Sequence, residues 1–486
     1  MSTTATLNVP IAPPDYEPAD RLGTIDPESG KLILSPDRDL PTAVAFVKQQ
    51  YTHRDSRTIH THAGMVYTWR GNHYRPREDA EILGELHPFL HDSLRPVEVR
   101  PGVEQLKPFP ANTRTVASGL QAIKTYTHLP SSASPPLWID GRAGPKPSEL
   151  LPLKSGTLHV PTGKTIQPTP LLFNTAAGDF DYNPDAPSPD RWLDFMVDCF
   201  GDDTEQIDTL QEWFGYALTA DTSQQKMLLM VGPRRSGKGT IARVLTQLVG
   251  PSNVTSPTTE SLSRPFGLQP LLGKSLAIIS DARFRGEHVA TVTERLLCIS
   301  GEDAITVDRK HRESVTLRLP TRFLILSNEL PKLSDSSKAL AGRFLILQLA
   351  RSFYGNEDTG LTAKLCGELP GILCWTIEGL KRLLQRGRFI PPSSTAEAMQ
   401  DLEDLASPVG AFVRDRCVVG TEHRISVDHL YAAWSVWCRD DGRIGPTTKQ
   451  TFGRDLAAAV ANLRTKRSAD DKRFYQGITL ANEVQQ

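Results

Sequence analysis

Apolar residues in the middle of the chain gather in short continuous runs separated by stripes of helical spacing. Residues 227–231 (MLLMV) form such a run, with the length and composition of a buried parallel strand. The stretch that follows has apolar residues on one helical face: Ile241, Val244, Leu245 and Leu248. Further apolar runs occupy residues 275–280, 322–327 and 344–347. Strands that alternate with helices predict an α/β fold.

The same patterns divide the chain into five regions. Residues 1–189 are of mixed α/β character with many loops: a loosely ordered lead over 1–40, a helix from Pro41 and a hairpin over 65–74. Two apolar helical stripes predict a helical block over 190–222. The α/β core follows over 223–352 and a helical lid over 353–406. A separate C-terminal unit over 407–486 begins at the break Ser407-Pro408.

A Gly-rich turn joins the first apolar run to its helix. It consists of Gly232, Pro233, Arg234, Arg235, Ser236, Gly237, Lys238, Gly239 and Thr240. The two glycines and the lysine have the spacing of a P-loop, in which backbone N–H groups and the helix N-terminus bind phosphate and the lysine reaches the β- and γ-phosphates. Gly239 stands where the Mg²⁺-binding hydroxyl usually follows the lysine, so Thr240 is the candidate ligand one position later. The turn predicts ATP and Mg²⁺ as cofactors.

The run over 275–280 ends in Asp281. A buried strand that ends in a carboxylate, some forty residues after a P-loop, is typical of the Walker B motif, whose acid holds Mg²⁺. Position 282 is alanine, so the usual second acid is missing. The general base is therefore expected to be Asp281 itself, or Glu302 or Asp303 brought from elsewhere.

Two β-rich segments around residues 305–307 and 315–317 flank a basic tip. The tip consists of Arg309, Lys310, His311 and Arg312. Such a hairpin offers several cations to a phosphate backbone, and we interpret it as a DNA contact, with a solvated turn as the alternative.

Two further polar residues lie at the ends of apolar runs. Asn328 follows the run over 322–327, where an amide can orient the attacking water and sense the γ-phosphate. Arg343 introduces the last run and is a candidate arginine finger for the nucleotide of a neighbouring subunit.

The C-terminal region has the pattern helix, helix and basic hairpin, which is a winged-helix plan. Its candidate DNA-binding residues are Lys449, Arg454, Arg464, Lys466, Arg467, Lys472 and Arg473. Asp470 and Asp471 dilute this basic patch, so docking of another protein is the alternative.

Two other constellations are disfavoured as sites. His60 and His62 would share a strand face, but no third metal ligand is near them in the sequence. Asp179 and Asp181 might be read as a polymerase carboxylate pair, but they follow no buried strand and precede turn chemistry.

Composition narrows the class of protein. The 486 residues suffice for about three domains. The net charge of −1 means that nucleic-acid affinity must come from local patches. The six cysteines are scattered without a zinc pattern, and no apolar run has the length of a membrane span or signal peptide. These features predict a cytoplasmic protein without a membrane partner.

The series GPRRSGKGT, IISDA, ISGED with the basic hairpin, FLILSNELP and AGRFLIL resembles superfamily 3 helicases, specifically the phage and plasmid primase/helicase group of AAA+ ATPases. The resemblance covers roughly residues 45 to 486. It implies a ring, expected to be hexameric, with ATP between subunits and a pore hairpin on DNA. It implies the following roles: phosphate and Mg²⁺ binding for Lys238 and Thr240, Walker B for Asp281, pore lysine for Lys310, sensor 1 for Asn328 and finger for Arg343.

The leading hypothesis is an ATP-dependent DNA helicase for replication of a phage, prophage or plasmid, acting on single-stranded and forked DNA. A replication initiator with little unwinding is the main alternative. The GKGT sequence also occurs in adenylate kinases, but a nucleotide kinase would need no basic hairpin. Because polymerase carboxylates are missing, a full primase-helicase is disfavoured and a separate primase or polymerase partner is expected.

Overall fold

The computed structural model describes residues 21–130, 133, 135–280, 282, 284, 288–310, 312–333, 339–440, 447–467 and 472–484. Asp281, His311, Asp470 and Asp471, which carry predictions above, lie outside these residues.

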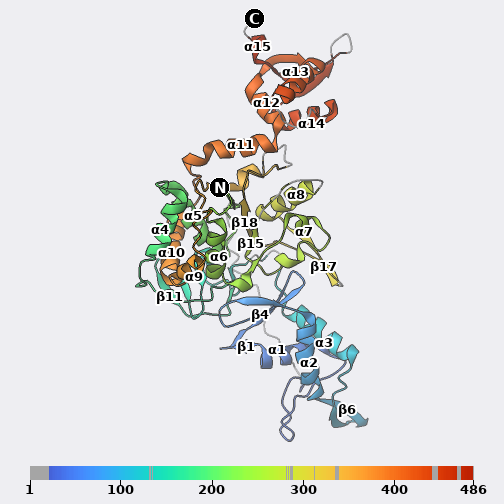
Figure 1. The fold of residues 1–486 in the computed structure, drawn as a ribbon. Coiled ribbons are helices and arrows are strands. Elements are labelled where there is room, and N and C mark those ends of the chain that lie inside the picture. Colours follow the sequence, from blue (N-terminus) through green and yellow to red (C-terminus); the bar gives the residue numbers. More distant parts are fainter. Residues whose placement is uncertain are drawn as a thin grey trace.

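A five-stranded parallel sheet forms the centre of the molecule (Figure 1). Its order is β14 (Val254–Thr255), β15 (Leu276–Ile279), β18 (Arg322–Ser327), β13 (Met227–Val231) and β19 (Phe344–Gln348). The register places Leu229 between Ile325 and Ile346. The four apolar runs of the sequence are therefore β13, β15, β18 and β19, whereas β14 was not predicted; the α/β class is confirmed.

Helices cover both faces of the sheet, because successive side chains of a strand point to opposite sides. Leu228 and Met230 pack into one core, whereas Met227 and Leu229 pack into the other. The first core includes α4 (Asp190–Phe200), α5 (Thr204–Leu218), α6 (Lys238–Val249), α9 (Leu361–Cys366) and α10 (Leu369–Arg386). The second includes α7 (Thr259–Ser263), α8 (Val289–Ser300) and α11 (Ala396–Ala406).

The predicted helical block and helical lid belong to these same layers. Helix α10 packs directly on α5, and a Cβ added at Gly379 would lie only 2.6 Å from the carbonyl oxygen of Gln211. A Cβ at Gly215 would likewise lie 2.5 Å from the Cβ of Leu380. The regions predicted over 190–222 and 353–406 thus share their cores with the sheet and do not pack as units of their own.

The N-terminal region has its own core, formed by α1 (Asp39–Gln50), α2 (Asp79–His91), α3 (Thr113–Tyr126) and strand residues such as Ile59 and Val66. A small antiparallel sheet consists of β3 (Ile59–His62), β4 (Met65–Trp69) and β5 (Tyr74–Arg77), which confirms the hairpin predicted over 65–74. The remaining N-terminal pairs are β1 (Thr52–His53) with β2 (Ser56–Arg57) and β6 (Leu94–Arg100) with β7 (Val103–Pro108).

The loosely ordered lead predicted over 1–40 is wrong for residues 21–38. Leu34 is fully buried in the N-terminal core, and Ile33 makes a parallel bridge to Leu94. The prediction rested on the local abundance of Pro and Asp, which says nothing about contacts with a strand sixty residues away.

Short strands connect this region to the central sheet. They are β8 (Leu137–Trp138), β9 (Leu150–Pro152), β10 (Thr157–His159), β11 (Lys164–Ile166) and β12 (Leu172–Phe173). A small core built on Phe173, Tyr67 and Tyr74 also receives Leu272 and Leu317 from the sheet region. The N-terminal region is thus packed against the central one.

The C-terminal unit stands beyond α11, away from the sheet (Figure 1). Its elements are α12 (Pro408–Arg416), β20 (Cys417–Ser426), α13 (Val427–Asp440), α14 (Lys449–Ala459), β21 (Arg464–Arg467), β22 (Arg473–Leu480) and α15 (Ala481–Val484). The strands form an antiparallel sheet in the order β20, β22, β21. Phe412, Trp434 and Phe452 are buried in a separate core, so the unit has its own packing.

Candidate functional site

The Gly-rich turn runs from the end of β13 to the start of α6, and both of its spaced glycines are required by geometry. Gly237 precedes α6 with φ of 96°, in the region that favours glycine. A Cβ there would also lie 2.8 Å from the Sγ of Cys199 on α4. A Cβ at Gly232 would lie 2.4 Å from the carbonyl oxygen of Leu349, just after β19. The loop backbone therefore lies so close to Cys199 and Leu349 that neither glycine position has room for a side chain.

Lys238 begins α6 and is only 9% exposed. Its ammonium group donates to the carbonyl oxygens of Gly232 (2.6 Å) and Pro233 (2.8 Å) and to the hydroxyl of Ser236 (3.2 Å). It also lies 3.4 Å from Oδ1 of Asn328, at the tip of β18. The structure thus brings together two residues that the sequence places ninety positions apart. A cation inside a loop at a helix N-terminus favours an anionic ligand.

The carboxyl ends of β13, β15 and β18 meet at this edge of the sheet. The N–H of Gly232 donates to the carbonyl oxygen of Ser327 at 3.2 Å. The N–H of Ala282, after β15, donates to the carbonyl oxygen of Leu326 at 3.0 Å. The P-loop, the segment after β15 and Asn328 are therefore neighbours, although Asp281 itself lies outside the described residues.

Arg243 is a residue of this site that the sequence analysis missed. Its guanidinium group donates to the hydroxyl oxygens of Thr240 (3.1 Å) and Thr362 (3.2 Å), so it links the first turn of α6 to α9. A Cβ added at Gly239 would lie 3.4 Å from this guanidinium group, which is ordinary van der Waals contact. The signal that could have revealed it is the spacing of three between Thr240 and Arg243, which puts both on one helical face.

The donor set suits a nucleoside triphosphate. Glycines that let the backbone approach a ligand closely, a buried lysine and a helix N-terminus are the elements that bind phosphate. The hydroxyl of Thr240 is the described candidate Mg²⁺ ligand, and a Mg²⁺ ion on ATP needs few protein groups because phosphates and waters complete its shell. The part of the chain that the structure describes contains no cluster of three or more His, Cys, Asp or Glu side chains that could hold a metal alone.

Arg343, Glu302 and Asp303 lie at the other edge of the sheet. Arg343 immediately precedes β19, whose first residue pairs with Met227 at the start of β13, whereas the P-loop follows the end of β13. A five-residue strand separates these edges by roughly 15 Å. Within one chain, Arg343, Glu302 and Asp303 therefore do not reach the phosphates held by Lys238. A role as base on the same chain's nucleotide is excluded for the two acids on this geometry.

A polar network forms around Arg343 at this edge. Its guanidinium group donates to the side-chain oxygen of Gln225, and the amide of Gln225 donates to Oε2 of Glu302 at 3.4 Å. The hydroxyl of Thr222 donates to Glu302 as well. Burial and, second, the charge of Arg343 hold the pKa of Lys226 below its usual range. Cations and one carboxylate are thus gathered at the amino ends of the strands.

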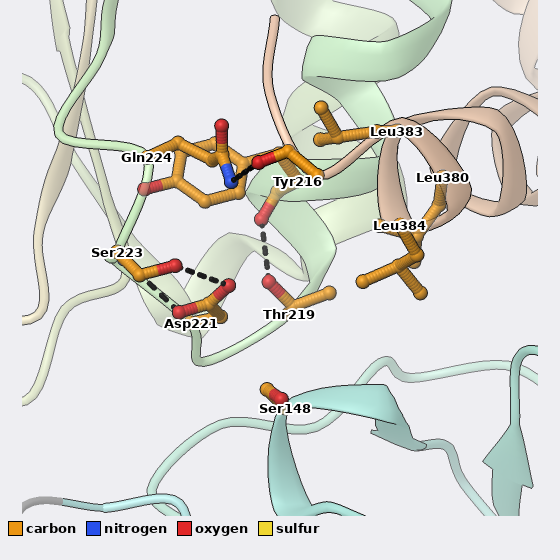
Figure 2. A pocket seen from close by; sticks show the side chains of 10 residues that line it. Ser148, Tyr216, Thr219, Asp221, Ser223, Gln224, Leu380, Leu383 and Leu384 are labelled. Atoms are coloured by element: carbon orange, nitrogen blue, oxygen red, sulfur yellow. Dashed lines mark hydrogen bonds between the residues drawn. The ribbon is translucent and has the colours of Figure 1, made fainter. Parts of the chain in front are cut away.

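A small pocket of about 150 Å³ lies beside this network (Figure 2). Its polar side includes Asp221 and Ser223 from the turn before β13, and its apolar side includes Leu380 and Leu383 of α10. Ser223 donates from both its N–H and its hydroxyl to the carboxylate of Asp221, each at 3.0 Å. The pocket contains no residue of the P-loop.

The predicted basic hairpin is present as β16 (Ile305–Arg309) and β17 (Arg312–Leu317). Lys310 at its tip has an exposed side chain, while its N–H donates to Oε1 of Gln269 at 3.1 Å. Arg309 bends back to donate to the carbonyl oxygen of Glu313 at 2.9 Å, and Arg312 forms an ion pair with Glu78 of the N-terminal region. Lys310 is therefore the described basic residue best placed to meet a ligand.

The basic residues of the C-terminal unit fall into two groups. Lys449 and Arg454, on α14, have ion pairs with Asp428 and Asp455. The side chains on β21 (Arg464, Lys466 and Arg467) are exposed, as are Lys472 and Arg473 across the turn. Both groups thus offer exposed cations on the surface of this unit.

The two disfavoured constellations have structural roles. His60 is buried in an aromatic cage, with ring centroids 5.4 Å from Tyr74 and 6.1 Å from Phe173. His62 contacts the same Phe173 ring at 5.8 Å. Asp181 accepts from the N–H (2.9 Å) and hydroxyl (2.6 Å) of Ser155, which is turn chemistry.

Comparisons with known proteins match two parts of the chain. Residues 230–343 match a family of unknown function, DUF5906, and residues 406–476 match the family model described as Poxvirus D5 protein-like. The first match begins in β13 and ends at Arg343, so it contains the whole P-loop edge and the basic hairpin. The second relates the C-terminal unit to D5-like proteins.

Among solved structures, the chain is similar to the C-terminal region of NrS-1. An apo structure of residues 305–718 has 13% identity and a TM-score of 0.44, covering 87% of this chain and 96% of that chain. An A-form apo structure has 12% identity and a TM-score of 0.38, covering 62% and 78%. Among the described helices, none has the length and apolar character that crossing a membrane requires.

Proposed function

We propose that this protein is an ATP-dependent DNA helicase of the superfamily 3 type, with an AAA+ core, that replicates a phage, prophage or plasmid. The observation that carries the proposal is the approach of Lys238 to Asn328 at the carboxyl edge of a parallel sheet. Lysine would hold the β- and γ-phosphates while the amide orients the attacking water. The similarity of residues 406–476 to D5-like proteins supports a replication role.

Mg²⁺-ATP supplies the bond whose hydrolysis drives movement. The residues of this chain would bind and orient it: the P-loop backbone would hold phosphate, Lys238 would neutralise charge, and Thr240 and Asp281 would be the protein ligands offered to Mg²⁺. Arg343 cannot act on the same chain's nucleotide, which favours its role as a finger for a neighbouring subunit in a ring, expected to be a hexamer. The hairpin with Lys310 grips single-stranded DNA at the pore.

The C-terminal unit is proposed to be a winged helix. Its order of helix, strand, helix, helix, strand and strand supports this, with β21 and β22 as the wing. Arg464, Lys466 and Arg467 of the wing would contact duplex phosphates, and the location would be the bacterial host cytoplasm. A separate primase or polymerase would complete replication.

A replication initiator that unwinds little DNA is the second candidate. The ion pair between Arg312 and Glu78 favours it, because that contact ties one side of the basic hairpin to the N-terminal region. Unwinding of a forked duplex separates the two functions: a helicase opens it at the expense of ATP, whereas an initiator binds without opening it.

The decisive experiment measures DNA-stimulated ATPase and fork unwinding for the wild type and Lys238→Ala. The variant should lose at least a hundredfold in turnover while keeping its circular dichroism, because the lysine acts on bound phosphate. Exposed Lys364→Ala, on α9, is the control for loss of a lysine and should keep wild-type turnover. ATPase of wild-type magnitude in Lys238→Ala would contradict the proposal.

A further inference from the structure

The segment over 351–357, which follows β19, packs against the P-loop. Its Ser352 hydroxyl donates to the carbonyl oxygen of Arg234 at 2.8 Å. Its Phe353 N–H donates to the carbonyl oxygen of Arg235 at 2.9 Å. Arg235 in turn lies 3.6 Å from a carboxylate oxygen of Glu357. Three contacts thus tie this segment to two consecutive P-loop residues.

A second set of contacts fixes the same segment to α4. Arg351 forms a 2.6 Å ion pair with Asp198, and its guanidinium carbon lies 4.9 Å from the centre of the Phe353 ring. The N–H of Asn356 donates to the carbonyl oxygen of Phe353 at 2.9 Å, which closes a turn around Tyr354. These contacts tether the backbone on both sides of Tyr354.

The side chain of Tyr354 is 80% exposed, more than any other large apolar side chain among the described residues. An aromatic ring left in water on a tethered turn gains nothing from packing in this chain. Its ring face is free to meet a flat ligand, and the nearest functional element is the P-loop.

The P-loop geometry indicates which ligand group would come to this side. Lys238 approaches Asn328, which follows β18, so a terminal phosphate held between these two residues would lie on the β18 side of β13. Strand β19 borders β13 on the opposite side, and the 351–357 segment continues from it. A nucleotide with its γ-phosphate near Asn328 would therefore extend its ribose and base toward Tyr354.

We propose that Tyr354 is the platform on which the base of the bound nucleoside triphosphate stacks. The inference rests on the proposed nucleotide-binding function of the P-loop. Stacking on an aromatic face is available to every base. The site is accordingly expected to accept adenine and guanine nucleotides alike, with the phosphate contacts supplying the common part of the affinity.

The test compares dissociation constants of Mg²⁺-ATP, Mg²⁺-GTP and inorganic tripolyphosphate for the full chain by calorimetry. Tyr354→Ala should weaken both nucleotides by roughly 5- to 150-fold, because base stacking on an aromatic ring contributes about 1–3 kcal/mol. It should leave tripolyphosphate, which has no base, unchanged within about twofold. Tyr354→Phe should retain nucleotide affinity. Phe266→Ala, another exposed aromatic, is the matched control and should alter none of the three.

The outcomes distinguish a failure of this inference from a failure of the proposed nucleotide binding at the P-loop. If Lys238→Ala loses both ATP and tripolyphosphate while Tyr354→Ala binds ATP like the wild type, the base platform is wrong and the P-loop function stands. Equal weakening of ATP and tripolyphosphate in Tyr354→Ala would also overturn the platform, because it would show a disturbed phosphate loop. If Lys238→Ala keeps its affinity for both, nucleotide binding at the P-loop fails and the platform fails with it.

Discussion

His60 is an ionisable side chain enclosed by aromatic rings, and its protonation state is coupled to folding. It is 1% exposed, and burial, with a smaller contribution from the charge of Arg57, lowers the pKa of His60 to about 3. In the unfolded chain a histidine has a pKa near 6.5. The unfolded state therefore binds a proton at mildly acidic pH that the folded state excludes.

We expect the free energy of unfolding to fall as pH drops below about 6.5, by about 1.4 kcal/mol per pH unit from His60, until the folded pKa is reached. Above pH 6.5 this contribution is fully present. The variant His60→Phe keeps a ring beside Tyr74 and Phe173 but cannot bind a proton there. Its unfolding free energy should therefore fall by about 2 kcal/mol less than that of the wild type between pH 7 and pH 5. Urea denaturation at both pH values measures it.

Exposed His91→Phe on α2 is the control and should retain the wild-type dependence on pH. A His60→Phe protein whose unfolding free energy varies with pH as steeply as the wild type would show that His60 titrates normally in the folded state.

At the scale of single residues, Lys238 could be picked out from the sequence because the P-loop pattern depends only on the spacing of neighbouring residues. Arg243 was missed because its meaning depends on the hydroxyl groups it reaches, and Thr362 is more than a hundred residues away. Local turns can be predicted from neighbours in the chain, whereas side-chain partners require the tertiary fold.

The hairpin of β16 and β17 is the element whose function can be tested separately from ATP binding. Its tip is at the end of two strands whose buried contacts, at Val307 and Val315, anchor its base in the core. We expect Lys310→Ala to keep basal ATPase within about twofold and to lose most of the stimulation by single-stranded DNA, because in the proposed function this side chain would contact DNA phosphate and not nucleotide. ATPase assays with and without DNA measure this.

Arg318→Ala removes an exposed cation just beyond the end of β17 and serves as the control. If both variants are stimulated by DNA like the wild type, the hairpin tip is a solvated turn.

Helices and strands could be predicted well wherever a single short apolar or β-rich run forms the whole element. Four of the five strands of the central sheet, all but β14, and the basic hairpin follow from apolar runs and β-rich segments at the predicted places. The lid over 353–406 was harder, because the close approach of Gly379 on α10 to Gln211 on α5 joins segments distant in sequence. The amphipathic pattern of a helix shows that it packs, but not on which neighbour.

At the scale of the whole molecule, the C-terminal unit has a core separate from that of the sheet. Deletion of residues 408–486 should therefore leave basal ATPase largely intact while weakening the binding of duplex DNA, since the exposed cations of β21 would be lost. Fluorescence anisotropy with a labelled duplex measures it, and triple replacement of Arg464, Lys466 and Arg467 by Ala in the full chain is the matched variant. Duplex affinity unchanged in both proteins would assign the unit to protein docking.

The position of Arg343 makes the assembled state testable. Because Arg343 and the P-loop lie at opposite edges of the same sheet, one chain alone cannot combine them in one active site. If Arg343 completes a neighbour's site, ATPase per subunit should rise with protein concentration as rings form. Arg343→Ala should bind ATP and assemble, yet lose roughly 10³-fold or more in turnover, because a finger stabilises charge that develops in the transition state.

Mixing two inactive variants gives the sharper test of the same geometry. A ring of Arg343→Ala and Lys238→Ala subunits contains interfaces where an intact P-loop from the first meets an intact arginine from the second. Such interfaces should restore part of the ATPase, and the activity should peak near equal amounts of the two proteins. In the folded chain Arg343 also donates to Gln225, so a purely structural arginine remains the competing explanation. That explanation is favoured if the variants co-assemble, as shown by mass photometry, and no mixture regains activity, because a structural defect stays within the subunit that carries it.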